Sequence, residues 1–361
     1  MTSTLTYASF RTQARMPALD GVRALATIGV LLHHTRNDPF GRLHGFRGVW
    51  LFFVLSGFLI TTLALREEDR TGALNVRAFA IRRVFRIMPL FYLALLAYLV
   101  WVCLLGMEPN GNLLLRFLAS YVVYCPEFPI VHNQFSIPFG QAWSLGIEEK
   151  FYLLWPLLAF VWLAHSRYRI VMVVGLMAST LFFSATSIEY AQIWGSYCDI
   201  LIGCLLGFLM HDRRGYECLR ILGRNDLTTS FVLLVLAAAT LSRLTGTQLG
   251  ERWFSLAAAA AIAALVTNTG FPAKLASHRW LKSVGVWSYA IYLTHPIAFD
   301  FWSRLLPAGR VGDYLSLVLT CVTDFPLCWA LHTWIEKPLI GVGRRATLRL
   351  EQTPSLGISY E

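Results

Sequence analysis

The chain has 361 residues, of which 56% are hydrophobic and only 14% are charged, and its mean hydropathy is +0.54. This charged share is about half that of an average soluble domain, which excludes a water-soluble enzyme and a disordered chain. The formal net charge of +10 would suggest nucleic acid in a soluble protein. In so apolar a chain it indicates the lipid bilayer as the partner and no nucleic acid.

Ten runs of mainly apolar residues are long enough to predict membrane-spanning helices. In chain order they cover residues 17–36, 46–65, 87–106, 141–164, 168–187, 194–211, 227–244, 253–270, 283–303 and 313–336. The segment 113–125 is only about 13 residues long and contains Arg116, so we expect an interfacial or re-entrant piece there. The prediction is an all-α polytopic transmembrane bundle forming one domain over residues 1–361. Its core covers about 17–340, with short tails and no appended esterase domain.

The basic residues test this count independently, because Lys and Arg accumulate in cytoplasmic loops. With ten crossings and a cytoplasmic N-terminus, about two thirds of the 31 Lys and Arg residues fall on the cytoplasmic side. A crossing at 113–125 would move every later loop to the other side and remove this bias. We therefore expect both termini in the cytoplasm and a location in the cytoplasmic (inner) membrane. Asp20 and Arg23 interrupt the first apolar run, which argues against a cleaved signal peptide.

The first predicted span carries four polar side chains at helical spacing. They are Asp20, Arg23, Thr27 and His34. At 100° per residue these positions lie on one stripe of a helix, with Arg23 and His34 roughly 16 Å apart. A simpler interpretation makes Arg23 a snorkelling anchor and His34 an interfacial residue. Such residues would not need to share a stripe with an acid, so we interpret the stripe as part of a functional site.

The third predicted span is preceded by a basic stretch in which Arg83 and Arg86 lie three residues apart on one face. Such a stretch is an ordinary cytoplasmic anchor in many membrane proteins. Two guanidinium groups at the inner edge of the membrane also suit the phosphates of a large anionic cofactor. The spacing alone does not choose between these interpretations.

The predicted span 141–164 contains two adjacent acids, Glu148 and Glu149, followed by Lys150. Two carboxylates at membrane depth are costly unless they are paired or solvated. Either one can pair with Lys150 or face a wet cavity, and only one shares a stripe with Trp143 and Tyr152. The alternative is a self-neutralising surface kink.

The later spans add a few isolated polar groups. The stretch 287–300 places Ser288, Tyr289, Tyr292 and His295 in one helix, although His295 precedes Pro296 and is also explained as a kink partner. The seven cysteines form no C-x-x-C pair, so we expect most of them to be small buried hydrophobic residues, with neither a disulfide framework nor a metal site. Gly57 is expected to permit close helix packing.

The chain resembles acyltransferase family 3, a family of integral membrane enzymes. The resemblance rests on the order and spacing of several segments over about residues 17–340. They are LDGVRALATIGVLLHH, GVWLFFVLSGFLIT, RRVFRIMP, AWSLGIEEKFYLLWP, SYAIYLTHP and IEKPL. The family's R-x10-H motif falls on Arg23 and His34, its R-x-x-R motif on Arg83 and Arg86, and the acid of its W-S-L-x-x-E segment on Glu148.

The resemblance implies an O-acyltransferase that moves an acyl group, usually acetyl, from cytoplasmic acyl-CoA to a hydroxyl of an extracytoplasmic or membrane-associated carbohydrate. We expect an exopolysaccharide, an O-antigen or another surface glycan as the acceptor, and a homo-oligomer is compatible with this. Alternatives are a macrolide-like secondary metabolite as the acceptor, or a transporter or flippase of lipid-linked sugars. No inverted repeat supports the transporter.

The same resemblance suggests roles for individual residues. His34 is the expected general base, and Glu148 is expected to orient it or the acceptor. Asp20, which shares the polar stripe of Arg23 and His34, is a further candidate catalytic residue on that ground and not through the resemblance. Arg83 and Arg86 would hold the phosphates of acetyl-CoA, and Arg23 would guide its thioester. Many members of the family carry a polar residue where this chain has Trp50, so the identity of the acceptor does not follow from the resemblance.

Overall fold

The computed structural model describes residues 4–13, 15–33, 44–106, 110–187, 189–241 and 248–352, and these ranges are almost entirely helical. The helices are α1 (Tyr7–Thr12), α2 (Pro17–His33), α3 (Arg47–Thr71), α4 (Val76–Leu99), α5 (Gly111–Arg116), α6 (Leu118–Val122), α7 (Glu127–His132), α8 (Ala142–Pro156), α9 (Arg169–Thr186), α10 (Ala191–His211), α11 (Arg213–Leu219), α12 (Asp226–Leu241), α13 (Gln248–Thr267), α14 (Phe271–Ala276), α15 (Arg279–Leu305), α16 (Arg310–Leu331) and α17 (Lys337–Gln352). The described ranges contain no strand, so the all-α prediction is confirmed.

Each of the ten predicted spans corresponds to a helix, in the order α2, α3, α4, α8, α9, α10, α12, α13, α15 and α16. Among the described residues, five helices are long and apolar enough to cross a membrane on their own. They are Arg47–Thr71, Val76–Cys103, Arg169–Thr186, Ala191–His211 and Arg310–Leu348. A sixth candidate is the pair Arg213–Gly223 and Asp226–Leu241, which is bent by 87°. The membrane-protein class is therefore supported, while the count of ten crossings stays a prediction.

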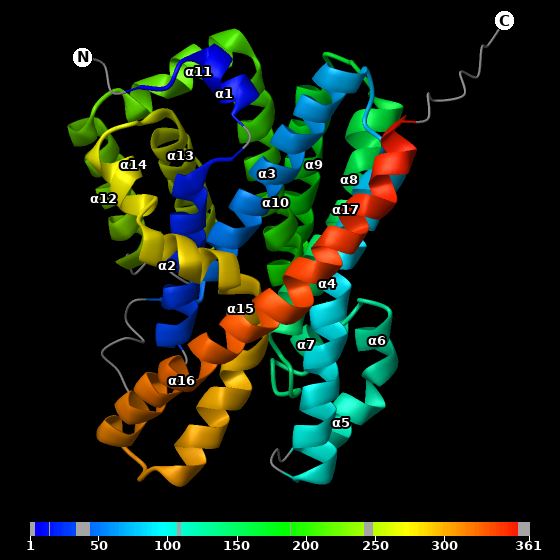
Figure 1. Ribbon diagram of the computed structural model, residues 1–361, viewed down its shortest axis with the longest axis vertical. Helices are drawn as coiled ribbons and strands as arrows, with labels where there is room; N and C mark the ends of the chain where they lie inside the picture. Colours follow the sequence, from blue (N-terminus) through cyan, green and yellow to red (C-terminus); the bar gives the residue numbers. More distant parts are fainter. Residues whose placement is uncertain are drawn as a thin grey trace, which may run out of the picture.

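The segment 113–125 forms two short helices, α5 and α6, beside the lower part of α4 (Figure 1). They have six and five residues. Neither is long enough to cross a bilayer, since about 20 helical residues are needed. This agrees with the expectation of a segment that does not span.

Helices α3 and α10 pack in the centre of the bundle through a close backbone contact (Figure 1). A Cβ atom on Gly57 would lie 1.9 Å from the carbonyl oxygen of Ile200. A Cβ atom on Gly203 would lie 2.0 Å from the carbonyl oxygen of Val54. The two backbones therefore meet without intervening side chains, which confirms the expected role of Gly57 and fixes the position of α3.

A tight turn joins α3 to α4 and sets the position of the basic residues on α4. Gly72 ends α3 with a φ of 84°, a left-handed conformation that favours glycine. Asn75 caps α4 by accepting a hydrogen bond from the backbone N–H of Ala78. Glu67 accepts from the N–H of Asn75 (3.0 Å) and pairs with Arg82 (2.7 Å), so the turn is held at both ends.

The described segments before residue 17 and after residue 340 pack against the bundle. Arg66 of α3 donates to the carbonyl oxygens of Phe10 and Gln13, which holds α1 against the helices. After α16 the chain passes through a π-helical turn, His332–Glu336, and continues as α17 to Gln352. Figure 1 shows α16 and α17 as one long diagonal path that ends beside α4.

Candidate active site

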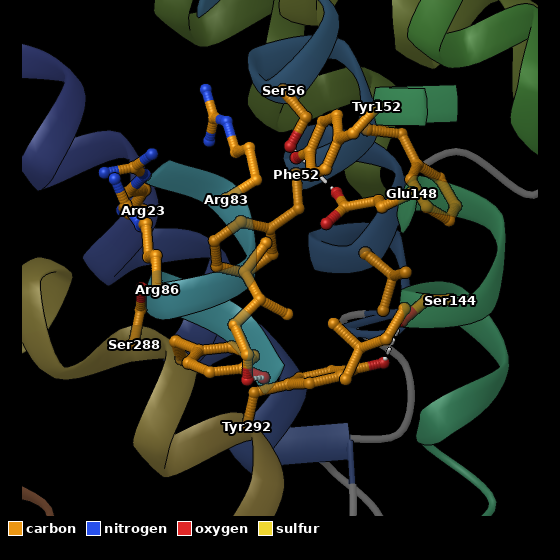
Figure 2. Close-up of a pocket in the computed structure, with 15 residues that line it drawn as sticks. Arg23, Phe52, Ser56, Arg83, Arg86, Ser144, Glu148, Tyr152, Ser288 and Tyr292 are labelled. Carbon is orange, nitrogen blue, oxygen red and sulfur yellow. Dashed lines mark hydrogen bonds between the residues drawn. The ribbon is translucent and has the colours of Figure 1, made fainter. Parts of the chain in front are cut away.

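A basic cavity lies where five helices meet, α2, α3, α4, α8 and α15 (Figure 2). Each of these helices carries one of the segments on which the family resemblance rests. The lining residues are Arg23, Val49, Phe52, Phe53, Ser56, Arg83, Arg86, Ile87, Ser144, Leu145, Glu148, Tyr152, Ser288, Tyr289 and Tyr292. The structure thus brings together four of the six predicted site residues, Arg23, Arg83, Arg86 and Glu148. These four are separated by up to 125 positions in the sequence.

Arg23 reaches the cavity from α2. It pairs with Asp20, one turn earlier, across 3.7 Å between guanidinium and carboxylate. Asp20 is not among the lining residues, so its carboxylate lies behind Arg23. The neighbouring helix α15 approaches closely here, because a Cβ atom on Gly285 would lie 1.8 Å from the carbonyl oxygen of Asp20. This approach brings Ser288 to the wall of the cavity beside Arg23 (Figure 2).

Arg83 and Arg86 reach the cavity from the first half of α4. The guanidinium of Arg83 lies over the ring of Tyr152 at 5.0 Å from its centroid. Neither arginine forms an ion pair with a carboxylate within the described ranges, whereas Arg82 pairs with Glu67. With Arg23 they place three positive charges against the single carboxylate of Glu148, and this excess of positive charge suits an anionic ligand.

Glu148 faces the cavity from α8, opposite the three arginines (Figure 2). The hydroxyl of Ser56 on α3 donates to one carboxylate oxygen at 2.8 Å. Ser56 is a polar residue in an otherwise apolar span, and this isolation is the only sequence signal that marks it. The hydrogen bond fixes the direction in which the Glu148 carboxylate points.

Lys150 pairs with Glu127 of the short helix α7, with 2.6 Å between the ammonium nitrogen and a carboxylate oxygen. Of the two alternatives that the sequence left open for Glu148, pairing with Lys150 or facing a cavity, the structure has the second. Burial raises the pKa of Glu127, and Lys150 opposes this shift. Nothing in the sequence spacing pointed to Glu127, because it lies outside the predicted spans.

A second, larger cavity with a volume of about 780 Å³ lies next to the first and is rich in aromatic residues. Those of its lining residues that carry an aromatic ring or a polar side chain are His33, Phe46, Trp50, Tyr98, Trp101, Phe135, Ser136, Phe139, Gln141, Trp143, Glu189, Gln192, Glu251 and Tyr292. On α4 it is lined by Tyr98, whereas the basic cavity is lined by Arg83 and Arg86 near the other end of the helix. This aromatic cavity therefore lies toward the opposite end of the bundle.

His34, the predicted general base, lies outside the described residues. Its neighbour His33 ends the described part of α2 and lines the aromatic cavity. His295 is buried, and its Nδ1 lies 2.8 Å from the carbonyl oxygen of Ile291, which agrees with the interpretation as a kink partner before Pro296.

Asp199, Asp300 and Asp324, three acids within the later predicted spans, are held by neighbours away from the basic cavity. Asp199 pairs with Arg252, Asp300 with Arg304 at 2.7 Å, and Asp324 accepts from Thr294 at 2.6 Å. Among the described residues no group of three or more His, Cys, Asp or Glu side chains is arranged to hold a metal ion.

Comparison with known proteins decides the family. The family model described as an acyltransferase domain matches residues 16–333. The chain belongs to this acyltransferase family. The predicted resemblance is thereby confirmed, and the predicted transferase class agrees with it.

Among curated proteins, the chain is similar to bacterial proteins named as O-acetyltransferases. The chain is 30% identical to the peptidoglycan O-acetyltransferase OatA of Listeria monocytogenes over 90% of its own length. It is 29% identical to the putative peptidoglycan O-acetyltransferase YrhL of Bacillus subtilis over 92% of its length. The chain covers 56% of the length of each of these relatives. No solved structure matches the chain.

Proposed function

We propose that this acyltransferase transfers an acetyl group from cytoplasmic acetyl-CoA to a hydroxyl of a cell-surface glycan. The observation that carries the proposal is the meeting of Arg23, Arg83, Arg86 and Glu148 in one cavity of a helical bundle. The relatives named as peptidoglycan O-acetyltransferases support a glycan as the acceptor and acetyl as the transferred group.

The donor binds in the basic cavity in this proposal. Arg83 and Arg86 hold the phosphates of acetyl-CoA through charge-assisted hydrogen bonds, for which they are available because no described carboxylate pairs with them. Arg23 directs the thioester toward the centre of the bundle, and Asp20 holds the Arg23 guanidinium in place. In this proposal the basic cavity is reached from the side of the basic loops, which we assign to the cytoplasm, where acetyl-CoA is present.

The acceptor enters through the aromatic cavity, whose rings and amide side chains suit the apolar faces and hydroxyl groups of a sugar. In the reaction the acceptor oxygen attacks the thioester carbonyl and the carbon–sulfur bond breaks. The hydroxyl proton passes to His34 as the general base and then to the departing thiolate, which leaves as free CoA. General-base catalysis of this kind contributes typically about 10²- to 10⁴-fold in rate.

Acetyl-CoA binding to the purified protein tests the donor site. At a ligand concentration of 100 times Kd, binding stabilises the folded state by about 2.7 kcal/mol, which a thermal unfolding curve detects. We expect this shift in the wild type and in Arg82→Ala, whose guanidinium is paired with Glu67 outside the cavity. We expect its loss in the double variant Arg83→Ala/Arg86→Ala. A wild-type curve that no acyl-CoA moves would contradict the proposal and favour a transporter.

Transfer itself is measured with labelled acetyl-CoA and a soluble peptidoglycan fragment. The label is expected on the fragment with the wild-type protein and not with His34→Ala. If folded His34→Ala transferred acetyl at the wild-type rate, the assigned general base would be wrong.

A further inference from the structure

The basic cavity and the aromatic cavity share a wall. Among the described residues only Val49 of α3 and Tyr292 of α15 line both of them. An acyl group that passes from one cavity to the other must cross at this place. We propose that Tyr292 is a partition that keeps water in the aromatic cavity away from the acyl thioester, and that an acceptor displaces it during transfer. This inference rests on the proposed function, because it assumes a thioester in the basic cavity.

The position of Tyr292 suits a partition. Its side chain lies across one end of the basic cavity, with the hydroxyl pointing toward Ser144 (Figure 2). The two hydroxyl oxygens are 2.8 Å apart, and the Tyr292 hydroxyl also donates to the carbonyl oxygen of Gln141 at 3.0 Å. Only 8% of Tyr292 is exposed. The Tyr292 side chain is therefore fixed at both ends. Its backbone belongs to α15, and its hydroxyl is hydrogen-bonded to Ser144 of α8 and to Gln141 directly before α8.

The hydrogen bond from the Tyr292 hydroxyl to Gln141 is connected to the aromatic cavity. The side-chain amide of Gln141 lines that cavity and donates to the hydroxyl of Tyr98 at 2.7 Å and to the carbonyl oxygen of Leu293 at 3.0 Å. A sugar that hydrogen-bonds to Gln141 or Tyr98 competes with these contacts. Acceptor binding thereby acts on Gln141, whose carbonyl oxygen accepts the hydrogen bond from the Tyr292 hydroxyl.

The helix that carries Tyr292 is weakened at the same point. In an α-helix the N–H of residue 296 would bond to the carbonyl of Tyr292, but residue 296 is proline and has no N–H. Pro296 and the following Ile297 line the aromatic cavity. The carbonyl of Tyr292 thus lacks its regular helical donor on the side from which the acceptor arrives. This leaves the Tyr292 turn less firmly fixed than the rest of α15.

The partition has a chemical purpose because a thioester reacts with water as well as with an alcohol. In hydrolysis the water oxygen attacks the acyl carbonyl, the carbon–sulfur bond breaks, and the products are the free carboxylate, the CoA thiol and a proton. In transfer the acceptor hydroxyl replaces water, and the ester is formed. Exclusion of water from a closed active site suppresses this side reaction. Opening the wall should therefore increase acceptor-independent release of CoA.

The experiment measures CoA thiol release from acetyl-CoA by the purified protein, without acceptor and with a soluble peptidoglycan fragment. We expect Tyr292→Ala to raise acceptor-independent release at least about tenfold, the rate equivalent of ~1.4 kcal/mol in barrier height. Val49→Ala opens the wall from the other side and is expected to act in the same direction. Tyr292→Phe keeps the ring but loses the hydroxyl that contacts Ser144 and Gln141, so we expect a smaller increase in acceptor-independent CoA release.

Tyr289→Phe is the matched control for Tyr292→Phe. Tyr289 lines only the basic cavity, and its hydroxyl donates to the carbonyl oxygen of Ile87 at 2.7 Å. Tyr289→Phe removes the same hydroxyl oxygen as Tyr292→Phe, but one helical turn away from the shared wall. We therefore expect no increase in the ratio of hydrolysis to transfer.

The outcomes separate this inference from the proposed function. If the wild type transfers acetyl while Tyr292→Ala and Val49→Ala release CoA without acceptor at the wild-type rate, the partition is overturned and the transferase stands. If Tyr292→Ala does not fold, Val49→Ala decides the question alone. If the wild type neither binds nor uses acetyl-CoA, both the proposed function and the partition are overturned.

Discussion

Ser56 of α3 and Glu148 of α8 are joined by a 2.8 Å hydrogen bond in the wall of the basic cavity. They lie 92 positions apart in the sequence, so the bond exists only when the two helices are packed. Because α3 is itself fixed against α10 by the contact of Gly57 with the backbone of Ile200, the direction of the Glu148 carboxylate depends on the central packing of the bundle.

We predict that Ser56→Ala lowers kcat/KM for acetyl transfer about 10- to 100-fold. A hydrogen bond to a charged group contributes about 1.5–3 kcal/mol, and its loss leaves the Glu148 carboxylate free to turn. Ser56→Thr keeps the hydroxyl and should retain most of the activity. The measurement is steady-state kinetics with labelled acetyl-CoA. Equal kcat/KM values in Ser56→Ala and the wild type would show that this hydrogen bond does not position Glu148.

Asp20→Asn distinguishes a positioning role for Asp20 from a catalytic one. Asp20 lies behind Arg23 and outside the cavity lining, so we expect the substitution to raise KM for acetyl-CoA severalfold and to leave kcat and its pH profile unchanged. The partly exposed ion pair is worth about 1 kcal/mol or less. A fall in kcat with an altered pH profile would instead place Asp20 in the chemistry.

The sequence motifs were sufficient to predict the helical class and the convergence of the basic residues. The stripe on 17–36 and the R-x-x-R spacing place Arg23, Arg83 and Arg86 on defined helix faces, and charges at membrane depth must face a cavity or a partner. The sequence left open whether Arg83 is an anchor or part of a ligand site, because a helix face does not reveal what it meets. The structure places Arg83 in the cavity and Arg82 on Glu67.

Other contacts were beyond the sequence because they join distant segments without any periodic signal. Lys150 pairs with Glu127, which lies in a segment too short and irregular to be assigned. Tyr292 was one of several polar residues on its span, and only the two cavities distinguish it from Tyr289. The span limits of the last helix were missed because π-helical continuation through His332–Glu336 has no compositional signature.

The buried pair of Arg169 and Glu68, at the end of the bundle assigned to the cytoplasm, should make the fold sensitive to the loss of either partner. Two guanidinium nitrogens of Arg169 lie 2.6 and 2.7 Å from the two Glu68 oxygens, and both residues are buried. Removing one partner of such a pair typically costs about 3–5 kcal/mol, because a buried charge is left unpaired. We expect this loss for Glu68→Gln in the free energy of unfolding.

Glu217→Gln is the control for that measurement. Glu217 pairs with Arg220 at 3.0 Å, but both side chains are exposed, so its loss should cost no more than about 0.5 kcal/mol. Similar stabilities of Glu68→Gln and Glu217→Gln would contradict the argument. A double variant, Glu68→Leu/Arg169→Met, removes both charges together and should recover much of the stability.

Trp50 is predicted to contribute to acceptor recognition. Its ring lines the aromatic cavity and is held by edge contacts with Phe46 at 5.0 Å and Phe254 at 6.0 Å between centroids, while the Arg47 guanidinium lies 5.9 Å from it. A ring fixed in this way offers an apolar face to a sugar at little cost in conformational entropy. We expect Trp50→Ala to raise KM for the acceptor about tenfold, equivalent to ~1.4 kcal/mol of binding free energy.

The same variant should leave acetyl-CoA binding unchanged, because Trp50 is absent from the lining of the basic cavity. Trp50→Phe keeps an aromatic face and should lie between Ala and the wild type in KM for the acceptor. The measurement combines acceptor kinetics with the acetyl-CoA thermal shift, so that a folding defect is recognised by loss of both. An unchanged acceptor KM in folded Trp50→Ala would remove Trp50 from the acceptor site. A weakened acetyl-CoA shift with unchanged acceptor KM would mean that the two cavities exchange the roles assigned to them.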